Sequence, residues 1–373
     1  MYAEAISGTQ PARHESIRIM LHTMLKSIDS AALREEAGTY SHGVSTFTSV
    51  LALKRGYDQE LASIAGLLHH YYYYKTGIAD FPGVNSAEAV RPLIRDMGSF
   101  SSEEQHTIIH AICRHSDREH VHEPYDEIVK DAVVLQHYFQ HSARLVSRED
   151  LPRLQHVLNE LNLPSGQIAI EIKPDVQAIG GNPDRRALLA DIAEQLASQA
   201  IIGIPGNRSY REICQYWPDA DIYSVLKGSW CAAFVYHCCR LAGILLPIRY
   251  PNSVCRFAGV GAWLEWSQLP EHEFFYRDRQ VGFTPQRGDI VIYEKLLSDH
   301  AHDHIGVVLA CDDDEILVAE GNRDNQNYSC VFRRDRAVCI LGYVRIDNRY
   351  VYHYAGEYDP LGLQKKKNNP IPG

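Results

Sequence analysis

The spacing of apolar residues in this chain changes its period once, and that change constrains the fold more than any other feature. From residue 15 to about residue 145, apolar residues such as Ile17, Leu21 and Met24 recur every three or four positions. This period predicts amphipathic helices. After about residue 280 the apolar runs are short, β-branched and separated by Gly, Asp and Asn, which predicts strands. We therefore expect an all-α half followed by an α+β half.

Stretches rich in proline and glycine at residues 173–175 and 180–183 indicate a break between the two halves. A chain of 373 residues is long enough for two domains with separate cores. The predicted division is an all-α domain at 1–150, a linker region at 151–184, an α+β domain at 185–350 and a tail at 351–373.

Individual elements follow from the same patterns. In the first half we expect helices over 58–68, 102–115 and 125–141, and one that is capped by Ser86 after a break at Pro82. In the second half we expect a helix over 188–202 and a helix that starts near Cys231. The predicted strands cover 289–293, 305–310, 315–319 and 338–344, with a further short strand at 167–172.

Composition limits the classes of partner and the compartment. A net charge of −10 argues against nucleic acid as a partner, and no run approaches the roughly 18 apolar residues of a membrane span. The first residues lack a positive segment followed by an apolar core, so we expect no signal peptide and a cytoplasmic location. Export by lysis or by a dedicated secretion system stays open. The nine cysteines show no CxxC spacing, which argues against a disulfide framework and a zinc ribbon.

One cysteine lies where a nucleophile would be expected. Cys231 falls at the start of the apolar helix, and a helix N-terminus favours the negative charge of a thiolate. His304, at the start of a predicted strand, could take the thiol proton. Glu320 or Asn322, at the end of the next strand, could accept a hydrogen bond from the other imidazole nitrogen and so fix its tautomer.

The order of these motifs resembles the CHAP amidase/peptidase family, which belongs with the NlpC-type enzymes among the papain-like cysteine hydrolases. The resemblance covers residues 185–350 and is carried by the motifs at 230–235, 243–244, 288–291, 304–308 and 320–322. It implies Cys231 as nucleophile, His304 as general base, Glu320 as the group that orients the imidazole and Asn322 as its support. It also implies a papain-like α+β fold, with the cysteine helix packed on an antiparallel sheet. Family members usually cleave amide bonds of peptidoglycan peptides and need no cofactor at the cysteine.

The helical half is rich in histidines at or near the ends of predicted helices, where neighbouring helices can share a metal ion. Four motifs lie at residues 40–42, 65–70, 110–115 and 129–132. Together they resemble the HD metal-dependent phosphohydrolase superfamily, and the resemblance implies an HD-like helical bundle with a divalent-metal site. The doublet that is His-Asp in the family is His69-His70 here, so the domain is degenerate. The candidate metal ligands are His42, His69, His70, His110, His115 and Asp131.

Three functions are consistent with these patterns. In the first, the protein is a cysteine-dependent amidohydrolase or peptidase acting on a peptide or peptidoglycan fragment through an acyl-thioester on Cys231. In the second, it is an HD phosphohydrolase acting on a nucleotide or another phosphoester, and the C-terminal domain only binds. In the third, both halves are catalytically silent and the protein is an interaction module.

Overall fold

The computed structural model describes residues 12–140, 145–164, 168–171, 184–299, 302–337 and 339–362. The chain divides into two compact units, one formed by residues 1–176 with 359–361 and the other by residues 177–358 with 362–373. We call the first the helical unit and the second the sheet unit, and describe each by itself. Among the described residues, no helix combines the length and the apolar character that a membrane crossing requires.

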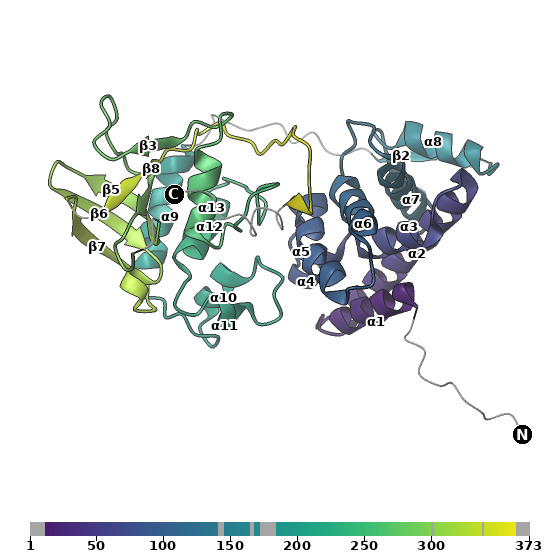
Figure 1. Cartoon of the computed structure of the whole chain (residues 1–373), viewed down its shortest axis with the longest axis horizontal. Coiled ribbons are helices and arrows are strands. Elements are labelled where there is room, and N and C mark those ends of the chain that lie inside the picture. Colours follow the sequence, from purple (N-terminus) through teal and green to yellow (C-terminus); the bar gives the residue numbers. More distant parts are fainter. Residues whose placement is uncertain are drawn as a thin grey trace, which may run out of the picture. The chain divides into compact units, whose positions relative to one another are not determined.

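The helical unit consists of helices and one small pair of strands (Figure 1). The strands β1 and β2 pair in parallel. Helix α8 falls in the range that we expected to be a linker, and it packs against α7. The elements are α1 (Arg13–Leu25), α2 (Ala31–Arg55), α3 (Gln59–Leu68), α4 (Tyr71–Thr76), α5 (Pro82–Met97), α6 (Ser102–Arg114), α7 (Pro124–Gln140), β1 (Leu145–Ser147), α8 (Leu151–Glu160) and β2 (Ala169–Glu171).

Small residues allow α2 and α3 to approach closely. A Cβ atom at Gly66 of α3 would lie 2.6 Å from the side-chain oxygen of Thr48 and 3.2 Å from the Cα of Ser45, both in α2. The hydroxyl of Ser45 donates to the backbone carbonyl of Ser63 at 2.9 Å, so the contact satisfies a buried polar group. This packing places the end of α3, and the histidines that follow it, against α2.

The helix caps agree with the predicted boundaries in two places and differ in one. Asp58 caps α3, and Ser101 forms a capping box with Glu104 at the start of α6. Ser86 was expected to be a cap, but it lies buried inside α5, which begins at Pro82. The prediction took Pro82 only as a helix breaker, whereas proline is also well suited to the first turn of a helix, where its missing N–H would have no partner in any case.

The sheet unit has an antiparallel sheet of six strands in the order β3-β8-β4-β5-β6-β7. Helices α9 and α12 pack against β5 and β6 in the middle of it (Figure 1). The strands β3 and β7 were not predicted. The elements are α9 (Arg185–Ala197), α10 (Arg208–Cys214), α11 (Ile222–Val225), α12 (Cys231–Leu241), α13 (Val260–Ser267), β3 (Phe275–Arg277), β4 (Ile290–Tyr293), β5 (His304–Cys311), β6 (Glu315–Glu320), a short 3-10 turn (Arg323–Asn325), β7 (Cys330–Asp335) and β8 (Ile340–Val344).

The Gly288-Asp289 pair, which we singled out in the sequence, fastens β4 to its surroundings. Gly288 has a φ of +89°, and a Cβ atom there would lie 2.2 Å from the backbone carbonyl oxygen of Arg186 in α9, so only glycine fits. The carboxylate of Asp289 is fully buried and accepts two hydrogen bonds from Arg345, at 2.9 and 2.6 Å. The pair therefore has a structural role in positioning β4 and α9.

Candidate active site

Cys231 is the first residue of α12, and its exposed fraction is 6%. The first hydrogen bond within the helix runs from Phe234 N–H to Trp230 C=O, so the N–H groups of the first turn have no acceptor inside the helix. Such groups favour a negative charge at the sulfur. Trp230 is buried and its indole N–H donates to Asn327 Oδ1 at 3.1 Å, which holds the residue before the cysteine in place.

His304 is the first residue of β5, and its imidazole is held by a carboxylate of the next strand. The Nε2 atom lies 2.7 Å from Glu320 Oε2, and both side chains are fully buried. The Nδ1 atom is also buried, and the side chain of Cys231 lies within hydrogen-bonding reach of the imidazole. Because Nε2 is engaged, Nδ1 is the nitrogen available to the thiol of Cys231.

The charges around His304 act on its protonation. Burial by itself would lower the pKa of this imidazole, but the neighbouring Glu320 carboxylate and the Cys231 sulfur raise the pKa to about 10. The imidazolium is therefore the favoured form of His304 over most of the pH range.

Glu320 is itself held by a residue that the sequence analysis did not identify. Arg334 of β7 donates to both oxygens of Glu320, at 2.9 and 3.2 Å. Burial would raise the pKa of Glu320, but the opposing effects of His304 and Arg334 lower it below the ordinary value. Arg334 also pairs with Asp324 and lies over the rings of Tyr293 and Phe332. The sequence does contain an arginine shortly after Glu320, which could have indicated a partner for its carboxylate. We did not use it because β7 was not predicted.

Gly306 makes room for the Glu320 side chain. Val307 of β5 pairs with Ala319 of β6, which places Gly306 next to Glu320. A Cβ atom at Gly306 would lie 2.7 Å from Glu320 Cγ. The glycine two residues after His304 is therefore required sterically, since any side chain there would displace the carboxylate that holds the imidazole.

Asn322 contacts the loop before Cys231 rather than the imidazole. It has a φ of +53°, and its amide donates to the backbone carbonyl of Gly228 at 2.8 Å and to Asn325 Oδ1 at 2.9 Å. Its own oxygen accepts from the backbone N–H of Asn327 at 3.1 Å. Of the two acceptors that we proposed for His304, the structure thus pairs Glu320 with the imidazole, while Asn322 links the end of β6 to the loop that precedes the cysteine.

In the helical unit, three of the six predicted metal ligands lie together. The ring centroids of His69 and His70 are 4.1 Å apart, and that of His115 lies 5.0 and 5.4 Å from them. Tyr40 of α2, which we did not predict as part of a site, stacks on His70 at 5.4 Å. Burial lowers the pKa of His70 to about 4 and that of His115 to about 3, so these imidazoles are neutral at neutral pH.

The hydrogen bonds of this cluster set the tautomers. His69 Nδ1 donates to the carbonyl of Gly66, and His115 Nδ1 donates to that of Ile112, each at 2.7 Å. Their Nε2 atoms are buried and have no hydrogen-bond partner among the described residues. Neutral imidazoles held in this way are suitable ligands for a transition metal such as Zn²⁺. The three imidazoles of this cluster are thus suited to binding a metal ion, but no carboxylate belongs to the cluster.

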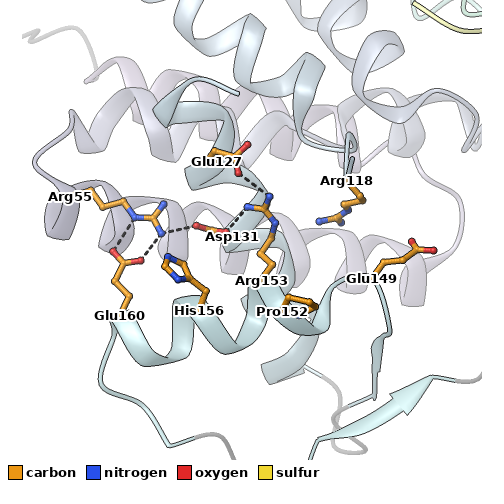
Figure 2. Close-up of a pocket in the computed structure, with 9 residues that line it drawn as sticks. All are labelled: Arg55, Arg118, Glu127, Asp131, Glu149, Pro152, Arg153, His156 and Glu160. Atoms are coloured by element: carbon orange, nitrogen blue, oxygen red, sulfur yellow. Dashed lines mark hydrogen bonds and ion pairs between the residues drawn. The ribbon is translucent and has the colours of Figure 1, made fainter. Parts of the chain in front are cut away.

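Asp131, the predicted carboxylate ligand, is occupied by arginines. Figure 2 shows its carboxylate between Arg55 and Arg153, which donate to its two oxygens at 2.6 and 2.7 Å. Arg55 also pairs with Glu160 and Arg153 with Glu127. Both oxygens of Asp131 are therefore used by cations of the protein itself, and this position does not act as a metal ligand in the structure.

The two remaining predicted ligands lie apart from the histidine cluster. His42 lines a pocket that also contains His14 and Glu60 and to which His69, His70 and His115 do not contribute. His110 Nδ1 lies 2.9 Å from Asp126 Oδ2. Within the described part of the chain, one group of at least three His, Cys, Asp or Glu residues has ligand atoms that all lie within 4.8 Å of one another, and it is Asp117, His120 and His122. The predicted six-residue metal site is thus not assembled, because spacing along helices did not show which face each residue takes.

The sequence model of the CHAP domain family matches residues 223–322. The match contains Cys231, His304, Glu320 and Asn322, and it supports a CHAP domain, a family of amidase- and peptidase-type hydrolases, in the C-terminal half. The comparison does not support the HD-like interpretation of the helical half. No curated protein matches the chain. No solved structure matches it either.

Proposed function

We propose that the sheet unit is a cysteine-dependent amidohydrolase or peptidase, with Cys231 as nucleophile and His304 as general base and acid. The observation that supports this most directly is the 2.7 Å contact between His304 Nε2 and Glu320 Oε2, which leaves the other imidazole nitrogen for a cysteine at a helix N-terminus. In this role Glu320 fixes the tautomer and position of the imidazole, and Arg334 holds Glu320.

The reaction would proceed in two steps. The Cys231 thiolate attacks the amide carbonyl carbon, and the His304 imidazolium gives its proton to the leaving amine as the C–N bond breaks. The acyl group is then held as a thioester on Cys231. His304, now neutral, takes a proton from water, and the resulting hydroxide attacks the thioester. The C–S bond breaks, the carboxylic acid is released, and the Cys231 thiolate and the His304 imidazolium are restored. The N–H groups of the first turn of α12 are suited to stabilising the oxyanion of each step.

The proposed substrate is a peptide of the kind found in peptidoglycan or its fragments. This part of the proposal is supported by the match to the CHAP domain and by the similarity of the motifs. The choice of substrate is independent of the proposed reaction mechanism, because Cys231, His304 and Glu320 could act in the same way on any accessible amide.

Replacement of the nucleophile tests the proposal. Cys231→Ala should abolish amide hydrolysis, a loss of roughly 10⁴-fold or more, measured as release of amine from defined peptidoglycan fragments by mass spectrometry. Cys255, an exposed free cysteine, supplies the matched control: Cys255→Ala should leave the rate unchanged. If Cys231→Ala neither changed hydrolysis nor removed the fastest iodoacetamide reaction of the protein, the proposed nucleophile would be wrong. Rapid alkylation of Cys231 without cleavage of these fragments would instead reject the substrate class.

A further inference from the structure

A pocket of about 410 Å³ lies in the sheet unit, away from the cysteine. Its wall is formed by Tyr250, by the segment before β3 and by the segment after β8. The strands β8 and β4 lie between β3 and β5, the strand that carries His304. With neighbouring strands about 4.8 Å apart, the edge of the sheet beside the pocket is roughly 14 Å from β5. The pocket is thus distinct from the candidate active site.

The wall is built mainly from aromatic rings that meet nearly at right angles. Tyr250 and Tyr354 lie 5.6 Å apart at 87°, and Tyr350 lies 5.4 Å from His272 at 88° and 5.6 Å from Phe274 at 82°. Rings in this arrangement can present several faces to one small ligand. The negative faces of aromatic rings attract cations, and sets of such rings bind organic ammonium groups in proteins.

The charge of the pocket favours a cation as well. Glu271 is the one carboxylate among the residues that line it, and neither lysine nor arginine is among them. The hydroxyl of Tyr250 donates to Glu271 Oε1 at 3.2 Å, which fixes the carboxylate beside the rings. Two histidines, His272 and His353, also line the pocket. Burial lowers the pKa of His272, which favours its neutral form.

The aromatic wall is held in place before any ligand binds. The hydroxyl of Tyr354 accepts from Asn252 Nδ2 and donates to the backbone carbonyl of Glu357, each at 2.7 Å. The ring of His272 is in turn packed against Phe274 at 5.4 Å. A wall that is already ordered lowers the entropic cost of binding.

We propose that this pocket binds a small organic ammonium ion, with the positive charge against the aromatic rings and Glu271. A neutral sugar could also stack on such rings, but it would not compensate the charge of Glu271. The proposal does not depend on the hydrolase function of the other site.

Calorimetric titration of the full chain at about pH 8, where ordinary imidazoles are neutral, tests this. The probe is choline, and its neutral counterpart of the same shape is 3,3-dimethylbutan-1-ol. Choline should bind at least about tenfold more tightly than the alcohol, and Glu271→Gln and Tyr354→Leu should each weaken choline binding by about tenfold. Glu271 and Glu273 are both exposed, but only Glu271 lines the pocket, so Glu273→Gln should leave choline binding unchanged.

Three results would overturn the proposal. The first is equal binding of choline and the alcohol, which would indicate an apolar site. The second is binding of N-acetylglucosamine without binding of choline, which would indicate a carbohydrate site. The third is choline binding that survives both Glu271→Gln and Tyr354→Leu in variants whose circular dichroism shows them to be folded.

Discussion

Two groups of chemically reactive side chains can be compared within this chain, and they differ in how the backbone brings them together. In the sheet unit, His304 and Glu320 belong to paired neighbouring strands, and the register of β5 and β6 brings their side chains to 2.7 Å. In the helical unit the candidate ligands come from separate helices, where the angle around each helix axis decides what a side chain contacts. His69, His70 and His115 lie together there, while Asp131 is held by two arginines.

The difference shows that the order of residues along the chain predicts side-chain contacts better between paired strands than between packed helices. Between paired antiparallel strands, the register fixes which side chains are neighbours: Gly306 lies opposite Glu320, and His304, two residues earlier on the same face, is its diagonal neighbour. Between helices, a shift of one position moves a side chain by about 100° around the axis, so a motif that is displaced by one or two residues contacts a different neighbour. Tyr40 lies against His69 and His70, whereas His42 lines another pocket.

Of the substitutions that test this comparison, the one at His304 should have the largest effect on the rate of amide hydrolysis. His304→Ala should reduce amide hydrolysis by roughly 10³- to 10⁴-fold, because the thiolate loses its cation and the leaving amine its proton donor. His302, exposed and two residues earlier in the chain, is the matched control: His302→Ala should keep the rate within about twofold. Steady-state kinetics on a defined peptide measure both. Equal losses in the two variants would mean that the residue at the start of β5 is not the base.

A smaller effect is expected at Glu320. Since the pKa of His304 is raised to about 10, activity that needs the imidazolium should persist through neutral pH and fall as the pH rises through that value. Glu320→Gln removes the nearest negative charge, so the alkaline limb should move to lower pH, and the rate near pH 7 should fall by about 100-fold. The pH profile of kcat/KM measures both changes. A lower rate with an unmoved alkaline limb would restrict Glu320 to a purely steric role.

The same raised pKa has a consequence for stability with a defined sign. The folded protein holds the proton on His304 more tightly than the unfolded chain, whose histidine has a pKa of about 6.5. The stabilisation is therefore fully present below pH 6.5 and is lost as the pH rises through about 10.

The smallest effect is expected at Asp131, and it should concern stability rather than hydrolysis. Asp131→Asn removes a charge whose exposed fraction is 5% and which pairs with Arg55 and Arg153. Local stability should fall by about 2 kcal/mol, seen as faster hydrogen–deuterium exchange in α7 and α8, with no change in amide hydrolysis.

Asp96→Asn, at a carboxylate with 66% exposure, is the control for Asp131→Asn and should change exchange little. A divalent metal that copurifies with the protein and is lost in Asp131→Asn would contradict the arginine pairing. In that case the helical unit would resemble a metal-dependent enzyme more closely than its structure indicates.

Much of the architecture could be predicted from the sequence, and the failures have physical causes. The helical half and the strands β4, β5, β6 and β8 were predicted from hydrophobic period. The antiparallel sheet beside helices was implied by the resemblance to the CHAP family. The strand β7 was missed because its sequence, CVFRRD, carries charges and is only partly buried, so that it lacks the apolar signal of a core strand. With β7 missing, the sequence offered no way to place Arg334 beside Glu320.

The contact between His304 and Glu320 was easier to predict than the grouping of the candidate metal ligands, for a related reason. Cys231, His304 and Glu320 each lie at the end of an element, and ends are marked in sequence by turn and cap residues. The role of Asn322 was harder to foresee, since its partner Gly228 is 94 positions away in the chain. No local pattern reports a contact over that distance.

A substitution at Gly306 would affect the position of the Glu320 carboxylate without affecting the pairing of β5 in the sheet. Alanine is tolerated in the backbone conformation of a strand, so a methyl group at position 306 would leave β5 in the sheet, but it would come within 2.7 Å of Glu320 Cγ. The carboxylate would then have to leave the imidazole while the unit kept its core. One substitution at residue 306 would thus leave the fold of the sheet unit in place while it removed the contact on which the proposed hydrolysis depends, even with Cys231, His304 and Glu320 all still present.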